Sequence, residues 1–239
     1  FSKSALSRTK TDRVHAKIIA QYARIMQPQT IKPEESERRE LTELVRHRRH
    51  LIRKRGQEIA YLQGVTDPQI KASVIPIIEA FSAQIKTIEA TIEQFLEKNS
   101  SLKKNLDLLV SIPGVGQGLA FAILTEIHPE DHTGTYSKSA QSAHAGLAPS
   151  KKESGTFRGQ EKISKVGNKE LRDALYMPAL SAMRCNPFVQ EFAARLKVKG
   201  KHNKVVLIAC MRKLLMISIG VLNNQAPFNP NWVSKPKAI

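Results

Sequence analysis

A serine surrounded by cations is the feature of this 239-residue sequence whose residue types suggest chemistry. The segment 145–172 reads AGLAPSKKESGTFRGQEKISKVGNKELR, and Ser154 lies in it directly before a glycine. Its basic neighbours are Lys151, Lys152, Arg158, Lys162 and Lys165. A serine hydroxyl is a poor nucleophile at neutral pH and needs activation. Because phosphoryl transfer depends mainly on positioning and charge stabilisation, the segment is a candidate for attack on a phosphodiester.

The residues alone leave other interpretations of this segment open. Ser150 and Ser164 also stand beside a lysine, and Tyr136 is a further hydroxyl nucleophile in principle. By spacing alone, a solvated basic loop with an incidental serine is the more common explanation. The segment has no apolar run long enough for a buried strand, so we expect a loop.

Asp12 and His15 form a candidate metal-binding pair near the N-terminus. Residues three apart on a helix share a face, and a carboxylate with an imidazole can hold a divalent ion. Mg²⁺ prefers oxygen ligands, so a capping Asp12 with a surface His15 is an equal alternative. The segment HPEDH (128–132) resembles a metal cluster superficially, but a solvated turn explains it better.

The charge balance indicates a polyanionic partner. The formal net charge is +17 and the isoelectric point is about 10.0, which favours nucleic acid because phosphate neutralisation releases counterions. An anionic membrane surface is the rival, but no aromatic-rich amphipathic face supports it. The apolar segment 205–222 is interrupted by Arg212 and Lys213, which favours a core helix over a membrane span.

Two cysteines and a polar N-terminus indicate the compartment. Cys185 and Cys210 have no metal-ligand spacing, and we expect reduced, buried thiols. The first residues, FSKSALSRTKTDR, contain no apolar segment of the signal-peptide kind. These features favour an intracellular, cytoplasmic protein.

Apolar periodicity predicts a short helix and then a long helical hairpin. The short helix covers 11–26, with Thr11 or Asp12 as its cap. Long helices follow over 35–62 and about 70–98, and the second carries a heptad seam. We expect an antiparallel coiled-coil hairpin, with two helices of a bundle core as the alternative. The face RHRRHLIRKR (46–55) suits a nucleic-acid backbone, although such faces are often merely solvated.

The segment 102–127 predicts a helix-hairpin-helix with the turn PGVG at its centre. Glycines permit the tight turn, and we expect Gly114, Val115 and Gly116 to contact DNA phosphates through backbone N–H groups. A packing turn without a ligand is the alternative.

Four more helices are predicted in the C-terminal half, near 137–145 and over 168–184, 187–200 and 203–224. Asn168 and Asn203 are the expected N-caps, and Pro178 is expected to interrupt its helix.

Several of these motifs, in this order, resemble a known family. They are KTDRVHA, IPGVGQGLAFAILTEI, AGLAP, the Ser-Gly pair and KISKVGNKELR. Together they are similar to transposases of the insertion sequence 110 (116/902) family, which includes the Piv-type DNA invertases. The resemblance covers nearly the whole chain and is most specific in the C-terminal part.

The resemblance implies a DNA transposase or site-specific recombinase with two catalytic parts. A RuvC-like domain of ribonuclease H fold would carry four acidic ligands for Mg²⁺, and a transposase domain would carry the nucleophilic serine, here Ser154. Asp12 would be the third acidic ligand. His15 stands where the family has its fourth, and the first two would precede Phe1. The resemblance also implies a structured guide RNA and a homo-oligomer joined through the coiled coil, with no membrane.

We therefore expect a mainly α-helical chain of three parts. Residues 1–33 would be the C-terminal remnant of the RuvC-like domain, 34–100 the coiled-coil hairpin, and 101–239 the helical transposase domain. The alternative function is a catalytically inactive nucleic-acid-binding remnant that uses the helix-hairpin-helix and the basic helix.

Overall fold

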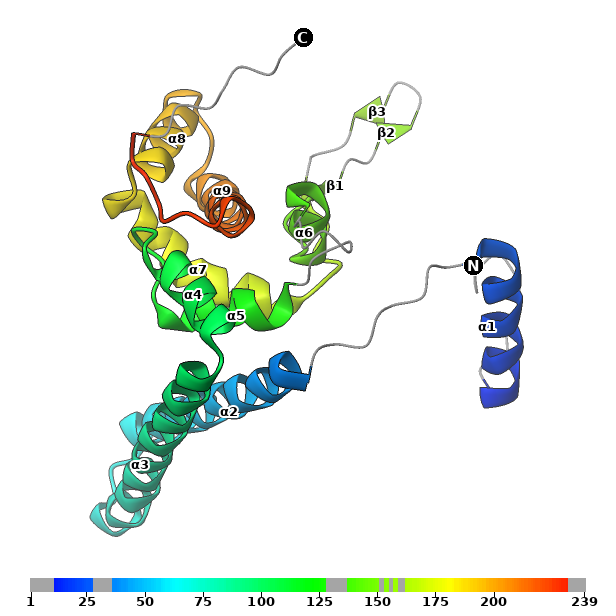
Figure 1. Cartoon of the computed structure of the whole chain (residues 1–239). Helices are drawn as coiled ribbons and strands as arrows, with labels where there is room; N and C mark the ends of the chain where they lie inside the picture. Colours follow the sequence, from blue (N-terminus) through cyan, green and yellow to red (C-terminus); the bar gives the residue numbers. More distant parts are fainter. Residues whose placement is uncertain are drawn as a thin grey trace. The chain divides into compact units, whose positions relative to one another are not determined.

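A computed structural model describes residues 11–27, 36–127, 137–150, 153–154, 157–158 and 162–231. These residues form nine α-helices and four strands of two residues each, which confirms the mainly α fold class. The chain divides into two compact units, Phe1–Glu35 and Ser36–Ile239. Figure 1 labels the helices and strands.

The first unit contains α1, Asp12–Met26. Thr11, not Asp12, is its N-cap, since the Thr11 side-chain oxygen accepts a hydrogen bond from the N–H of Val14 at 3.4 Å. Asp12 lies in the first turn, where a carboxylate opposes the positive end of the helix dipole.

The second unit begins with a helical hairpin. Helix α2, Ser36–Gly64, packs along α3, Pro68–Lys98. Asp67 caps α3 by accepting hydrogen bonds from the N–H groups of Gln69 and Ile70, at 2.7 and 3.3 Å. The apolar seam predicted from the sequence is buried at Leu41, Val45, Leu51, Val74, Ile85 and Ile92. The two stripes therefore pack against each other, as their periodicity predicts.

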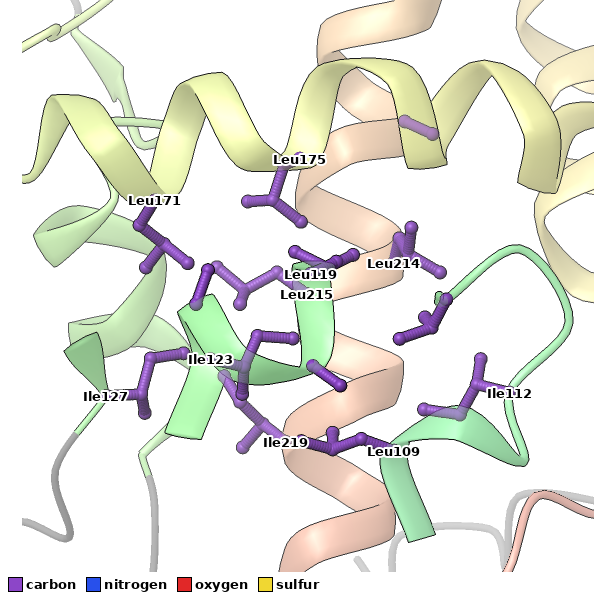
Figure 2. Packing of buried hydrophobic residues seen from close by; sticks show 14 of the residues in the cluster. Leu109, Ile112, Leu119, Ile123, Ile127, Leu171, Leu175, Leu214, Leu215 and Ile219 are labelled. Atoms are coloured by element: carbon purple, nitrogen blue, oxygen red, sulfur yellow. The ribbon is translucent and has the colours of Figure 1, made fainter. Parts of the chain in front are cut away.

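Six further helices are described in this unit, around a core that α5 and α9 dominate. Their bounds are α4 Ser100–Val110, α5 Gln117–Glu126, α6 Lys138–His144, α7 Lys169–Cys185, α8 Pro187–Val198 and α9 Asn203–Asn224. Every α5 residue from Leu119 to Glu126 is buried. Figure 2 shows side chains of α5 meeting Leu171 and Leu175 of α7 and Leu214, Leu215 and Ile219 of α9.

Helix α9 is the core helix that the sequence predicts. Among the described residues it alone has the length and apolarity of a membrane span, with a mean hydropathy of 2.2 in an 18-residue window. Of that window, 56% is buried inside the protein. Its apolar surface is thus largely used in packing against α4, α6, α7 and α8.

Three local predictions about the helices and the cysteines are wrong. Pro178 does not interrupt α7, because the buried residues Leu175, Ala179 and Ala182 hold both sides of the proline in the core. His202, not Asn203, caps α9, since its ring Nδ1 accepts from the N–H of Lys204 at 3.3 Å.

The third wrong prediction concerns the thiols. Both cysteines are free, but only Cys210 is buried, and its burial raises the pKa of the thiol to about 11. Cys185, the last residue of α7, is exposed because it lies on the same outward face as exposed Ser181, whereas Ala182 and Asn186 are buried.

Gly114 is the glycine of the α4–α5 turn that the fold requires. Its φ is +92°, and a Cβ atom there would lie 2.7 Å from the Cα of Ala182 in α7. Asn186 secures the same turn by donating its side-chain N–H to the carbonyl of Pro113 at 3.1 Å. The turn therefore packs directly on α7.

We predict that Gly114→Ala lowers the free energy of unfolding by about 2 to 4 kcal/mol, because positive-φ strain and overpacking add. Urea denaturation measures the change. Gly118→Ala is the matched control, since a Cβ there meets nothing within 4 Å, and it should leave stability unchanged or slightly higher. Equal effects of the two substitutions would contradict the close packing of the turn on α7.

Candidate active site

The segment around Ser154 forms a β-ribbon made of two antiparallel strand pairs. The sequence predicts a loop there. Strand β1, Pro149–Ser150, pairs antiparallel with β4, Lys162–Ile163. Further along, β2, Glu153–Ser154, pairs antiparallel with β3, Phe157–Arg158. Backbone pairing of such short strands needs no apolar run, which is why hydropathy does not reveal them. In Figure 1, β2 and β3 lie at a distance from the helices.

Two glycines hold the root of this ribbon. Gly146 has a φ of +65° and Gly167 a φ of +134°, and a Cβ on Gly167 would lie 2.1 Å from the carbonyl oxygen of His144. The chain leaving α6 and the chain entering α7 are joined by hydrogen bonds from the N–H of Lys165 to Gly146 and of Ser164 to Ala148, at 3.3 and 3.0 Å. The two chains therefore approach too closely for larger residues.

Asn168 connects the ribbon root to two helices. Its Oδ1 caps α7 by accepting from the N–H of Leu171 at 3.0 Å, as predicted, and its Nδ2 donates to Glu126 Oε2 at 2.7 Å. Its own N–H donates to the carbonyl of His144 at 2.6 Å. The side chain and the backbone N–H of this one residue thus tie α5, α6 and α7 together where the ribbon returns.

Glu126 also forms ion pairs with arginines of the helical hairpin. This carboxylate is 7% exposed, and two α2 arginines approach it, Arg46 at 3.4 Å and Arg49 at 3.9 Å. Arg49 further pairs with Glu170 in the first turn of α7. Arg38 donates to the carbonyls of Leu124 and Ile127 at the end of α5. The hairpin is thus anchored to the helical core by arginines.

The basic face 46–55 therefore has a structural use that the sequence did not predict. Arg48 donates from Nε to Glu89 of α3 at 2.8 Å, and Arg46 and Arg49 pair as described. Arg53 and Lys54 remain exposed, so this half of the face stays a candidate for nucleic-acid contact.

The predicted DNA-contacting residues occupy different environments. Arg158 and Lys162 lie on the ribbon strands, and Lys165 lies at the root with a φ of +55°. Lys151, Lys152, Tyr136 and the segment 128–132 lie outside the described residues. In the α4–α5 turn, Val115 is buried and its N–H donates to Ile112 at 2.9 Å, whereas Gly116 is exposed at the start of α5.

A groove of about 1670 Å³ opens beside the ribbon root. Its walls include Leu147, Pro149, Ile163 and Lys165 from the ribbon, Arg172, Tyr176 and Met177 from α7, and Lys204, Arg212 and Lys213 from α9. In the sequence, Arg212 and Lys213 indicate only that the apolar segment is not a membrane span. Two cations within an otherwise apolar core helix are the signal that identifies this wall.

The metal pair is incomplete in the described residues. Asp12 and His15 both lie on α1, in the first unit. Within the described part of the chain, no group of three histidine, cysteine or acidic side chains is placed to share a metal ion. A single carboxylate does not make a magnesium site, so the described residues do not fit Mg²⁺ by themselves.

Comparison with known proteins decides the family. A model of the transposase IS116/IS110/IS902 family matches residues 106–194, and a DEDD-type transposase model for IS110 elements matches residues 1–68. The chain is 33% identical over 238 residues to the pilin gene-inverting protein of Moraxella bovis, with 96% of this chain and 71% of that protein covered. The chain belongs to the IS116/IS110/IS902 family of transposases. The family match confirms the resemblance that the sequence motifs indicate.

Other relatives of this transposase support the same family assignment. The pilin gene-inverting protein of Moraxella lacunata has the same identity and coverage. An uncharacterised 43.6 kDa protein of insertion element IS110 from Streptomyces coelicolor is 27% identical over 152 residues, covering 64% of this chain and 36% of that protein. The transposase is therefore an enzyme of the family of DNA transposases and invertases. The IS116/IS110/IS902 match contains the whole β-ribbon and Ser154.

We predict that Asn168→Ala destabilises the transposase by about 2 to 4 kcal/mol, because it removes a helix cap and a hydrogen bond to a buried carboxylate. Asn168→Ser is the control, since serine also caps helices but does not extend to Glu126. It should cost about 1 kcal/mol less. Thermal and urea unfolding measure both variants, and equal losses below about 0.5 kcal/mol would contradict the role of Asn168.

Proposed function

We propose that this transposase cleaves and rejoins DNA through Ser154. The observation that carries the proposal is the ribbon register, in which Ser154 pairs with Phe157 on strands whose root is held by Gly146 and Gly167. Catalytic groups often lie on a projecting segment that a rigid scaffold positions. The surrounding lysines and arginines suit a scissile phosphate.

In the proposed step, the Ser154 oxygen attacks a DNA phosphorus. The new O–P bond forms as the bond from phosphorus to one bridging oxygen of the strand breaks. The hydroxyl proton leaves the serine, and the departing oxygen takes up a proton. The phosphoserine diester conserves the bond energy, so a second strand's hydroxyl can attack it, restore the serine and complete strand transfer.

Cations of the ribbon would stabilise the charge that develops on the phosphate. Arg158 and Lys162 follow Ser154 on β3 and β4, and Lys151 and Lys152 precede it in the sequence. Arginine binds phosphate oxygens in pairs, whereas lysine acts as a point charge. Ser150 and Ser164 remain competing hydroxyls, because both lie on or beside the β1–β4 step.

The family's DEDD part implies Mg²⁺, with Asp12 as one ligand and His15 in place of another. Bound there, the ion would supply charge stabilisation for DNA cleavage. We also propose that the α4–α5 pair acts as a helix-hairpin-helix. The first N–H groups of α5, at Gln117 and Gly118, have no intrahelical acceptors and suit a phosphate oxygen.

Guide RNA, self-association and location are further parts of this proposal. The family resemblance supports RNA guidance and a nucleoid-associated cytoplasmic protein. A coiled coil through α2 and α3 is supported by exposed apolar residues on the hairpin, namely Ile59, Tyr61, Ile70, Ile75 and Ile77. In this scheme 1–33 ends the RuvC-like domain, 34–100 is the coiled coil, and 101–239 is the transposase domain.

We predict that Ser154→Ala abolishes the covalent protein–DNA adduct trapped on a nicked suicide substrate, because no other hydroxyl holds the same position. The assay uses the complete reading frame, including any residues encoded upstream of Phe1, and denaturing electrophoresis detects the adduct. Ser150→Ala and Ser164→Ala are matched controls and should retain it. An adduct that survives Ser154→Ala refutes the nucleophile, and DNA binding without any adduct in the parent favours the inactive remnant.

We predict that Ile77→Glu shifts the chain toward monomer, because a carboxylate on an apolar contact face costs free energy when buried. Sedimentation velocity measures the change. Gln94→Glu introduces the same charge at another exposed position of α3 and should leave the oligomer intact. A parent chain that is already monomeric at micromolar concentration would contradict the proposed coiled coil.

A further inference from the structure

The groove beside the ribbon root carries a large excess of positive charge. Its described lining contains one carboxylate, Asp173, and six cationic side chains. The cations are Lys165, Arg172, Lys201, Lys204, Arg212 and Lys213. Like charges lining one concave surface repel each other, and an anion relieves that repulsion.

Arg212 shows that part of this charge has no compensating group among the described residues. The arginines that anchor the hairpin, Arg46 and Arg49, each have a carboxylate partner. Half-buried Arg212 forms no ion pair with a described carboxylate, and its buried Nε has no acceptor among the described residues. A buried donor without a partner is costly, so the groove holds an arginine that is suited to an external anion.

The same groove also exposes apolar and aromatic surface. Tyr176 is 45% exposed, Met177 67% and Val205 51%. A groove that served only to attract counterions would gain nothing from such residues. Cations that follow a backbone, together with side chains on which bases rest, are the combination that single-stranded nucleic acids require. A duplex keeps its base faces stacked inside, so it offers no base to stack on these side chains.

From these observations we propose that the groove binds a single-stranded segment of DNA next to the phosphodiester on which Ser154 acts. The inference rests on the proposed function and extends it. We assign the groove to DNA and not to RNA because it begins at the root of the ribbon that carries Ser154. Its residues there are Leu147, Pro149 and Lys165. Arg212 and the lysines would contact phosphates, and Tyr176 would stack on a base.

The test measures binding of a fluorescein-labelled single-stranded DNA 20-mer to the Ser154→Ala chain by anisotropy. This background excludes covalent attachment, so the outcome does not depend on whether Ser154 is the nucleophile. Lys201 and Lys204 are exposed and suit a double alanine variant. At about 0.1 M salt each lost phosphate contact weakens single-strand binding about fivefold, so the double variant should bind about 25-fold more weakly. Its log–log salt slope should fall by about 1.4.

Matched controls separate a groove from general basicity. Lys71→Ala/Lys86→Ala removes the same charge from exposed positions of α3 and should change affinity less than about threefold. Tyr176→Leu should weaken single-strand binding about fivefold or more, with little effect on a duplex of the same sequence. Circular dichroism confirms that each variant is folded.

Three results would overturn the assignment. The first is an equal loss of affinity in the groove and α3 double variants. The second is a loss of affinity for duplex DNA in the groove variants that equals their loss of affinity for single-stranded DNA. The groove would then be a duplex-binding surface. The third is an RNA 20-mer of the same sequence that binds more tightly than DNA and depends on the same lysines, which would make RNA the occupant.

Discussion

A buried carboxylate, Glu126, holds together the parts that this transposase must position. It accepts from Asn168 at the ribbon root and pairs with Arg46 of the helical hairpin, while Arg49 lies within reach of it and of Glu170. A carboxylate at 7% exposure is tolerable only when donors surround it. Because the donors come from distant segments, the charge is satisfied only when α2, α5 and α7 have assembled.

Around this junction, packing supplies the rigidity that a projecting ribbon requires. Helix α5 is buried along almost its whole length, and Gly114 lets the turn before it approach α7 at van der Waals distance. Gly146 and Gly167 make a similar close approach at the ribbon root. The ribbon thus starts from a position that has little freedom, and its register places Ser154 opposite Phe157.

Charge in this protein divides into two kinds. Arginines at the hairpin junction neutralise carboxylates and act as structural ties. The cations of the groove between the ribbon root, α7 and α9 face one acid among the described lining residues. A net charge of +17 does not distinguish these kinds, since composition counts charges and only contacts show which are already neutralised. In the proposed scheme, the groove cations are the ones that attract a polyanion.

Periodicity was enough to predict nearly all helices, the hairpin seam at Leu41 and Val45 and the core position of α9, because those features depend on residues within a few turns. Motif order also identified the family and singled out Ser154. Pairing and packing in the folded chain decided the rest: the ribbon pairs, the arginine ties of α2 to residues far along the chain, and the continuity of α7 through Pro178. Each of these depends on which chain segments meet after folding. Spacing along one segment carries no information about a partner that lies 80 or more residues away.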